Sequence, residues 1–266
     1  MTAAMWAFVR RDHLIMTSYR FSFLLQALVV IGIVIGLNFA GRVLFADAQH
    51  IVNGISKDYF DYMLTGLAFA DVLTVGLSAF PRAVQSGYSS GTLEAMLLAH
   101  FRLSAIVLFS SIHGFLVSLL RFSIYAVTAV FVFGLWHETN FLSAFCIFSL
   151  SVVTFGALGV LSTAFVLVLK QGDPVISVYG ASSLLFGGVL FPVSVLPDWI
   201  QPFSALVPLT HSLTGMRLAL QGVTVTDLMP QIMSLIVMNL VFVPSSIFMF
   251  NWALNRAKRE GSLVQY

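Results

Sequence analysis

The sequence has little charge and almost no cysteine. Charged residues make up 9% of the 266 residues, whereas they make up about a quarter of a soluble domain. A soluble globular protein is therefore excluded, and the mean hydropathy of +0.96 makes the bilayer the expected solvent. The single Cys146 excludes an intrachain disulfide and is expected to pack within a hydrophobic stretch.

Three kinds of sequence motif are absent, and each absence excludes a class of function. The chain has no G-x-x-x-x-G-K-[ST] loop, so any ATP must be bound by another chain. Its net charge is only +2, and it has no basic run with interleaved aromatic residues, so nucleic acid is not an expected partner. It also has no nucleophile motif and no metal-ligand spacing, so no catalytic, cofactor or metal residues are assigned.

Six stretches of the sequence are predicted to span the membrane. A spanning helix needs roughly 20 mainly apolar residues to cross about 30 Å of hydrocarbon. The stretches are residues 21–44, 59–80, 103–135, 141–169, 175–191 and 228–252. The fifth is short and runs into the segment that follows it. The fold predicted is all-α and integral to the membrane, as a single transmembrane domain over residues 1–266, with residues 1–20 as an interfacial helix on the cytoplasmic surface.

Lysine and arginine predict the orientation of these helices, because cytoplasmic loops carry most of the positive charge. With the N-terminus inside, the residues on the cytoplasmic side are Arg10, Arg11, Arg20, Arg82, Arg102, Lys170, Arg256, Lys258 and Arg259. Those at or beyond the outer ends are Arg42, Lys57 and Arg217. This bias predicts a multi-pass protein of the cell membrane with both termini in the cytoplasm.

Residues 191–222 are apolar but cannot form one spanning helix. Prolines recur every five or six residues, at Pro192, Pro197, Pro202 and Pro208. Each removes a backbone donor and clashes with the preceding turn. Inside a membrane, such backbone is tolerated only within protein or around water. The segment is therefore predicted to form short broken helices that enter the outer membrane face, with Trp199 at the headgroup level.

Two ionisable residues fall within predicted spans. Counted from outer ends near 59 and 134, Asp71 and Arg121 lie about 18 and 20 Å deep at about 1.5 Å per residue. We expect them to pair, because isolated charges in a membrane are costly. The sequence is compatible with three alternatives: a static pair that locks two helices, a gating or substrate role, and no contact at all.

Two further features of the sequence are a stripe of small residues in the first span and a polar break after the second. Gly32 and Gly36 form a small-residue stripe on the first span that serves either internal packing or a dimer contact. After residue 80 the sequence PRAVQSGYSSGTLEAMLLAHFR reads as a polar break followed by a short helix, 91–99. Thr92 is suited to cap that helix, and Glu94 favours its positive end.

Several of these residues resemble a known family. They are Gly91, Thr92, Leu93, Glu94 and Leu97 in the short helix, Phe191, Pro192, Leu196, Pro197, Trp199, Pro202, Pro208 and Arg217 in the proline-rich segment, and the run FGALGVLSTAFVLVLK in the fourth span. Their order and the six-span layout are similar to those of the type 2 permeases of ABC exporters. The chain departs from that pattern at residues 85–90, which lack the acidic residues common before GTLE.

The resemblance implies a permease subunit that works with a second permease chain, identical or not, and with cytoplasmic ABC ATPase subunits that hold ATP and Mg. Residues 91–97 would seat in the ATPase, and Phe191, Pro192, Pro197, Trp199 and Arg217 would belong to re-entrant helices that close the exit. The expected cargo is a drug-like molecule or lipid, with lipid-linked polysaccharide as the alternative. An ion-coupled transporter that uses Asp71 and Arg121 is the alternative of another class.

Overall fold

The computed structural model describes residues 20–43, 59–89, 114–128, 139–169 and 174–259. Most of these residues are helical and no strand occurs among them, so the all-helical prediction is confirmed. The elements are α2 (Arg20–Val43), α4 (Tyr59–Ser89), an unlabelled helix Gly114–Thr128, α7 (Phe141–Leu169), α8 (Pro174–Phe186), the 3₁₀ turn η2 (Val193–Val195), α9 (Gln201–Ala205), α10 (Pro208–Leu220) and α11 (Met229–Arg259).

Three helices of the described chain are long and apolar enough to cross a membrane. They cover Tyr59–Gln85, Phe141–Leu169 and Met229–Ala257. Shorter apolar helices cover Leu24–Phe39, Gly114–Thr128 and Ile176–Phe186. The predicted fourth span coincides with α7, whereas much of the predicted third span lies outside the described residues. The six-span layout therefore stays a prediction.

The helix that contains the second predicted span, 59–80, is longer than that span. Helix α4 passes through Pro81 and continues to Ser89. A proline inside a helix costs about 3 kcal/mol, so the helix beyond it needs support from packing. Phe80 and Val84 supply that support, because they are buried in one cluster with α7 and α11. Helix α11 likewise passes Pro244 and ends at Arg259, seven residues beyond the prediction.

The fifth predicted span, 175–191, is also corrected. Helix α8 ends at Phe186 after 13 residues, which amounts to about 20 Å at 1.5 Å per residue. The chain then turns at Gly188, whose φ of 77° lies in the left-handed region that favours glycine. The short α8 therefore leads directly into the proline-rich segment.

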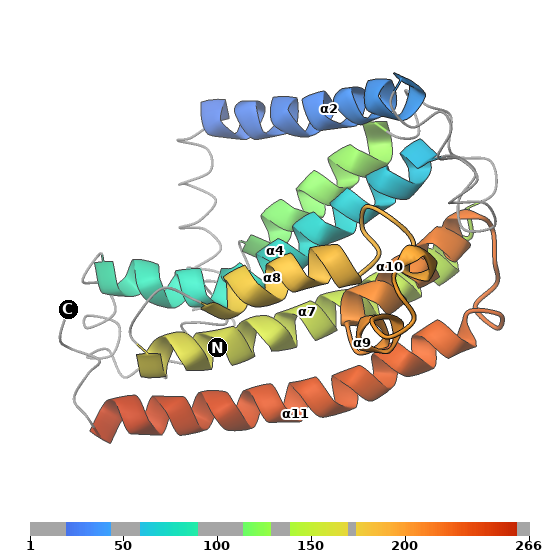
Figure 1. The fold of residues 1–266 in the computed structure, drawn as a ribbon. Helices are drawn as coiled ribbons and strands as arrows, with labels where there is room; N and C mark the ends of the chain where they lie inside the picture. Colours follow the sequence, from blue (N-terminus) through green and yellow to red (C-terminus); the bar gives the residue numbers. More distant parts are fainter. Residues whose placement is uncertain (1–19, 44–58, 90–113, 129–138, 170–173, 260–266) are drawn as a thin grey trace.

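Helix α7 lies at the centre of the packing (Figure 1), between α11 on one side and α4 on the other. Its hydroxyl groups form hydrogen bonds with α11 and α10. Thr154 donates to the Asn239 side chain of α11 at 2.9 Å, and Ser151 donates to Ser212 of α10 at 2.7 Å. Such hydrogen bonds join helices where lipid offers no polar partner.

Glycines bring α4 and α7 into close contact. A Cβ atom on Gly159 would overlap the carbonyl oxygen of Gly76, and one on Gly76 would lie 2.7 Å from Cβ of Phe155. Small residues at a crossing permit this approach of two backbones. The crossing therefore depends on glycine at both positions.

Helix α2 lies at the edge of the molecule (Figure 1). Val30 and Val34 pack in a small cluster with residues of α4, whereas Leu24, Leu28 and other apolar side chains of α2 are exposed. A Cβ atom on Gly32 or Gly36 would meet nothing within 4 Å. Within the described residues, the small-residue stripe is therefore not used for internal packing.

We expect Gly159→Ala to lower the free energy of unfolding by about 1–3 kcal/mol, the usual cost of overpacking. The added methyl group meets the backbone of Gly76, which cannot rotate away. Thermal unfolding of the purified protein in detergent measures the change. Gly180→Ala is the control, because a Cβ atom there meets nothing within 4 Å. Equal stability of the Gly159 variant and the native protein would contradict the close crossing.

Candidate functional site: the proline segment and an ion pair

The proline segment, residues 188–222, is bounded by two glycines with positive φ, Gly188 and Gly222. Its prolines stand at the starts of short elements. Pro192 precedes η2, Pro202 lies in the first turn of α9, and Pro208 begins α10. Proline suits these positions because its φ is already helical and no N–H is needed in the first turn. The segment is thus divided into short helices, while its entry into the membrane stays a prediction.

Arg217 of α10 is buried, with 4% of its surface exposed. Its Nη1 donates to the carbonyl of Gly188 at 2.9 Å, and its Nη2 donates to the carbonyls of Tyr62 at 2.9 Å and Val189 at 3.4 Å. The guanidinium carbon also lies 3.4 Å from the centroid of the Tyr62 ring. One side chain therefore connects α10, α4 and the turn after α8.

The turn after α8 is held by α4 as well. The Tyr62 hydroxyl donates to the Gly188 carbonyl at 2.6 Å, and the Tyr59 hydroxyl donates to the Leu190 carbonyl at 2.9 Å. Gly66 permits this contact, because a Cβ atom there would overlap the Val189 carbonyl oxygen. Three successive carbonyls of the turn are thus bound by side chains of α4 and α10.

The charge of Arg217 is stabilised by dipoles. Within the described ranges, no carboxylate forms an ion pair with it. Burial lowers the pKa of Arg217 to about 10, while the adjacent Tyr62 raises it. The guanidinium therefore remains charged at neutral pH, with carbonyl oxygens and the Tyr62 ring as its counterparts.

Helix α10 is also fixed to the start of α7. The backbone N–H of Asn140 donates to the Ala219 carbonyl at 2.9 Å, and the Ser143 hydroxyl donates to the Val223 carbonyl at 2.9 Å. A Cβ atom on Gly215 would lie 2.7 Å from Cδ1 of Ile147. The proline segment is therefore anchored to α7 at its end and to α4 at its beginning.

The predicted gate residues differ in their surroundings. Pro192 is buried and Phe191 is half-buried, whereas Pro197 is exposed. Trp199 is 72% exposed. Its apolar neighbours Val195, Phe203 and Leu206 are exposed too. Only Arg217 of the predicted set takes part in the contacts that hold the turn after α8.

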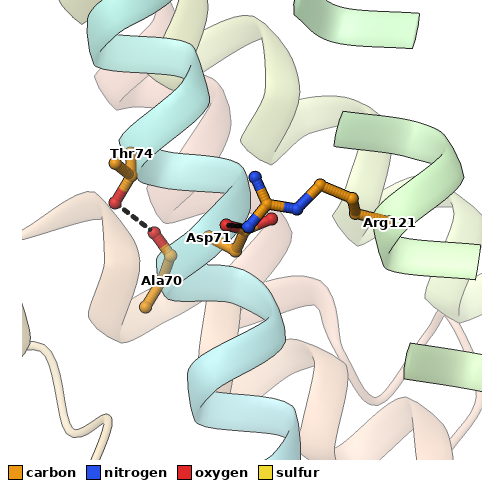
Figure 2. Close-up of polar contacts among 4 residues, drawn as sticks. All are labelled: Ala70, Asp71, Thr74 and Arg121. Carbon is orange, nitrogen blue, oxygen red and sulfur yellow. Dashed lines mark hydrogen bonds and ion pairs between the residues drawn. The ribbon is translucent and has the colours of Figure 1, made fainter. Parts of the chain in front are cut away.

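Asp71 and Arg121 lie side by side, as Figure 2 shows, and come from α4 and from helix Gly114–Thr128. The Arg121 Nη2 atom is 2.6 Å from Asp71 Oδ1, and the two side chains are 29% and 16% exposed. The Thr74 hydroxyl, one turn further along α4, donates to the carbonyl of Ala70 at 2.7 Å and does not join the pair.

The predicted coupling residues Gly91, Thr92, Leu93, Glu94 and Leu97 lie outside the described residues. Helix α4 ends at Ser89, two residues before Gly91. The helix whose first turns bind the proline segment therefore leads directly to the coupling sequence.

Sequence reasoning identified Arg217 but missed Tyr59, Tyr62, Gly66 and Gly188. The spacing of Tyr59, Tyr62 and Gly66 is a signal that was available, because positions i, i+3 and i+7 lie on one face of a helix. The partners of that face are main-chain carbonyls, which carry no signature in a sequence.

The arrangement of long apolar helices and a proline-divided segment is consistent with a membrane permease domain. The sequence matches the family model described as ABC-2 type transporter over residues 3–220. The match covers most of the chain, and the protein belongs to the ABC-2 type transporter family. That family is a transmembrane permease domain, not a catalytic one, and generally pairs with an ABC ATPase. A search of curated proteins finds no match.

We expect Arg217→Met to lower the free energy of unfolding by about 1.5–3 kcal/mol, because hydrogen bonds from a charged group are lost. Amide hydrogen exchange should also accelerate in residues 188–200, since methionine keeps the apolar stem but releases the carbonyls. The exposed Arg82 on α4 supplies the matched control, Arg82→Met. Unchanged exchange in the proline segment would contradict the role of Arg217.

We expect Asp71→Ala and Arg121→Ala each to lower the free energy of unfolding by about 3–5 kcal/mol, since each leaves one charge without its partner. The charge-swapped double variant Asp71→Arg with Arg121→Asp should be more stable than either single variant. Thermal unfolding of the four proteins tests this. A swap as unstable as the single variants would show that the pair does not hold the helices.

Proposed function

We propose that this chain is the membrane-spanning permease subunit of an ATP-driven ABC exporter. Its cargo would be a hydrophobic or amphiphilic molecule, drug-like or lipid, moved out of the cytoplasm or inner leaflet. The observation that carries the proposal is the family match over residues 3–220. ATP and Mg would bind to a separate cytoplasmic ATPase, because this chain has no phosphate-binding loop.

In the proposed exporter, α4 links the ATPase to the exit. It has 31 residues, or about 46 Å at 1.5 Å per residue. Tyr59 and Tyr62 at its start bind the turn that opens the proline segment, and its end lies two residues before the coupling sequence. ATP-driven movement of residues 91–97 would therefore reach the proline segment through one continuous helix.

The proline segment would close the exit as a re-entrant structure on the outer face. Both termini would then lie in the cytoplasm and the protein in the cell membrane. Support comes from the exposed apolar side chains Val195, Trp199, Phe203 and Leu206. Such side chains are suited to the membrane interface, where tryptophan is enriched.

A second permease chain, identical or not, would complete the path. Helix α2 supports this because many of its apolar side chains are exposed, and Gly32 and Gly36 are open. Small residues on an exposed spanning helix permit close contact with another helix.

The Asp71–Arg121 pair favours a second candidate, an ion-coupled transporter, because charges inside spans mark ion pathways. The two proposals differ in their energy source. Transport by an exporter stops when ATP is removed, whereas ion-coupled transport stops when the ion gradient is dissipated. Lipid-linked polysaccharide is the alternative cargo for the exporter, and a transport screen distinguishes it from drug-like molecules and lipids.

We expect Glu94→Arg to abolish co-purification of the permease with its ATPase, because it reverses the charge at the start of the coupling helix. Loss of permease-dependent stimulation of ATP hydrolysis should accompany the loss of association. Glu138→Arg is the control, because Glu138 lies between the predicted third and fourth spans, 103–135 and 141–169, and the predicted orientation puts that loop on the outer side. Normal assembly and normal stimulation in the Glu94 variant would refute the coupling assignment.

A further inference from the structure

We propose that the outward face of the last turns of α11 binds an anionic phospholipid of the leaflet that this end of the helix meets. The lipid would be a bound partner of the permease, distinct from its cargo, and the inference does not depend on the identity of the cargo or of the ATPase. The face, called the α11 stripe below, consists of Val241, Ser245, Phe248, Trp252, Arg256 and Arg259.

The α11 stripe follows one side of the helix. Its members are three or four residues apart, the spacing of a single helix face, and all of them are exposed. The opposite side of the same turns is buried against α4 and α7 through Phe250, Ala253, Leu254 and Ala257. This packing fixes the rotation of α11 and directs the α11 stripe away from the rest of the chain.

The exposed side of α11 changes from apolar to charged over a length that matches a membrane. Its exposed apolar side chains run from Met229 to Trp252, or about 35 Å at 1.5 Å per residue, enough to cross about 30 Å of hydrocarbon. Arg256 and Arg259 follow about 6 and 10 Å beyond Trp252. Headgroup layers add roughly 5–7 Å on each side, so the guanidinium groups begin at the depth of lipid phosphates.

Arg256 is positioned by its neighbour in the α11 stripe. Its guanidinium carbon lies 5.6 Å from the centroid of the Trp252 ring, within the range of about 6 Å for a cation–π contact. The guanidinium is therefore directed back toward the membrane boundary, where tryptophan is enriched. Guanidinium groups bind phosphate through paired hydrogen bonds. A phosphate can thus meet Arg256 while the acyl chains of the same lipid lie along Phe248 and Val241.

The charge of the α11 stripe favours an anionic lipid over a zwitterionic one. Helix α11 contains no acidic residue between Met229 and Arg259, so the fields of the two arginines add. A zwitterionic headgroup brings its own cation next to these arginines, whereas an anionic headgroup does not. Each basic residue near an anionic lipid surface strengthens the attraction, and the headgroup therefore determines which lipid is bound.

A second copy of the chain is a poor occupant of the α11 stripe. In a two-fold symmetric contact about an axis along the membrane normal, each residue lies at the same depth as its copy. Arg256 and Arg259 would then meet the same arginines of the partner, and like charges repel. Helices α2 and α11 also lie at opposite edges of the molecule (Figure 1), so a second permease chain that pairs through α2 leaves the α11 stripe open to lipid.

The test measures lipid contact at Trp252 in the full chain, reconstituted in phosphatidylcholine vesicles. The replacements Trp6→Phe, Trp136→Phe and Trp199→Phe leave Trp252 as the only tryptophan. The probes are phosphatidylglycerol and phosphatidylcholine with identical brominated acyl chains, because bromine quenches tryptophan fluorescence on contact. We expect phosphatidylglycerol to bind at Trp252 about 25-fold more tightly than phosphatidylcholine, since each of the two arginines contributes about fivefold.

The decisive variant is the double replacement Arg256→Gln with Arg259→Gln, which should fold because glutamine is a good helix former. The preference for phosphatidylglycerol should fall to about one. Arg82→Gln is the matched control, because Arg82 is an exposed arginine of α4 outside the α11 stripe, and it should keep the preference. Native mass spectrometry of the chain with all its tryptophans should show the same loss of bound phosphatidylglycerol in the double variant.

Three results would overturn the inference. Absence of quenching by brominated phosphatidylcholine alone would show that protein, not lipid, covers the α11 stripe. Equal binding of the two lipids by the native arginines would refute selection by charge. An unchanged preference in the double variant would assign the selection to other residues. None of these results bears on the exporter proposal, which the Glu94→Arg experiment tests separately.

Discussion

A buried guanidinium must be surrounded by acceptors, and the burial of Arg217 imposes this constraint on the arrangement of the proline segment. Within the described residues its acceptors are main-chain carbonyls of Tyr62, Gly188 and Val189. The carbonyls converge because Gly188 adopts positive φ and Gly66 lacks a side chain. Each of these features would be costly alone, and together they position α10 against α4.

Helix α4 contacts two arginines of neighbouring helices in different ways. Near its start, Tyr62 meets an arginine that is sealed from solvent and stabilised by dipoles. Nine residues later along the helix, Asp71 meets an arginine that is partly exposed. Arg217 donates through both terminal nitrogens, and Arg121 contacts Asp71 through its Nη2 atom. In both arginines the Nε atom has no partner within the described residues. Both contacts therefore join helix α4 to a neighbouring helix through the ends of the guanidinium groups.

The sequence predicted features that depend on local chemistry. Uniform apolar character was sufficient to predict α7, and the prolines were sufficient to predict the division of residues 191–222. The continuation of α4 beyond Pro81 could not be predicted, because it depends on the burial of Phe80 and Val84 against other helices. The partners of Arg217 are main-chain carbonyls of a turn that forms only in the fold, and no residue type encodes them.

The crossing of α4 with α7 determines how movement would be transmitted in the proposed exporter. Gly76 lies against Gly159 with no room for a side chain, so α4 is held most closely to α7 at this point. Tyr62 lies 14 residues before Gly76 and Ser89 lies 13 residues after it, or about 20 Å in each direction at 1.5 Å per residue. Rotation about this contact would move the two ends by similar distances in opposite directions. Because Tyr62 and Arg217 bind the same turn, displacement at the coupling end would act first on the carbonyl contacts that hold the proline segment.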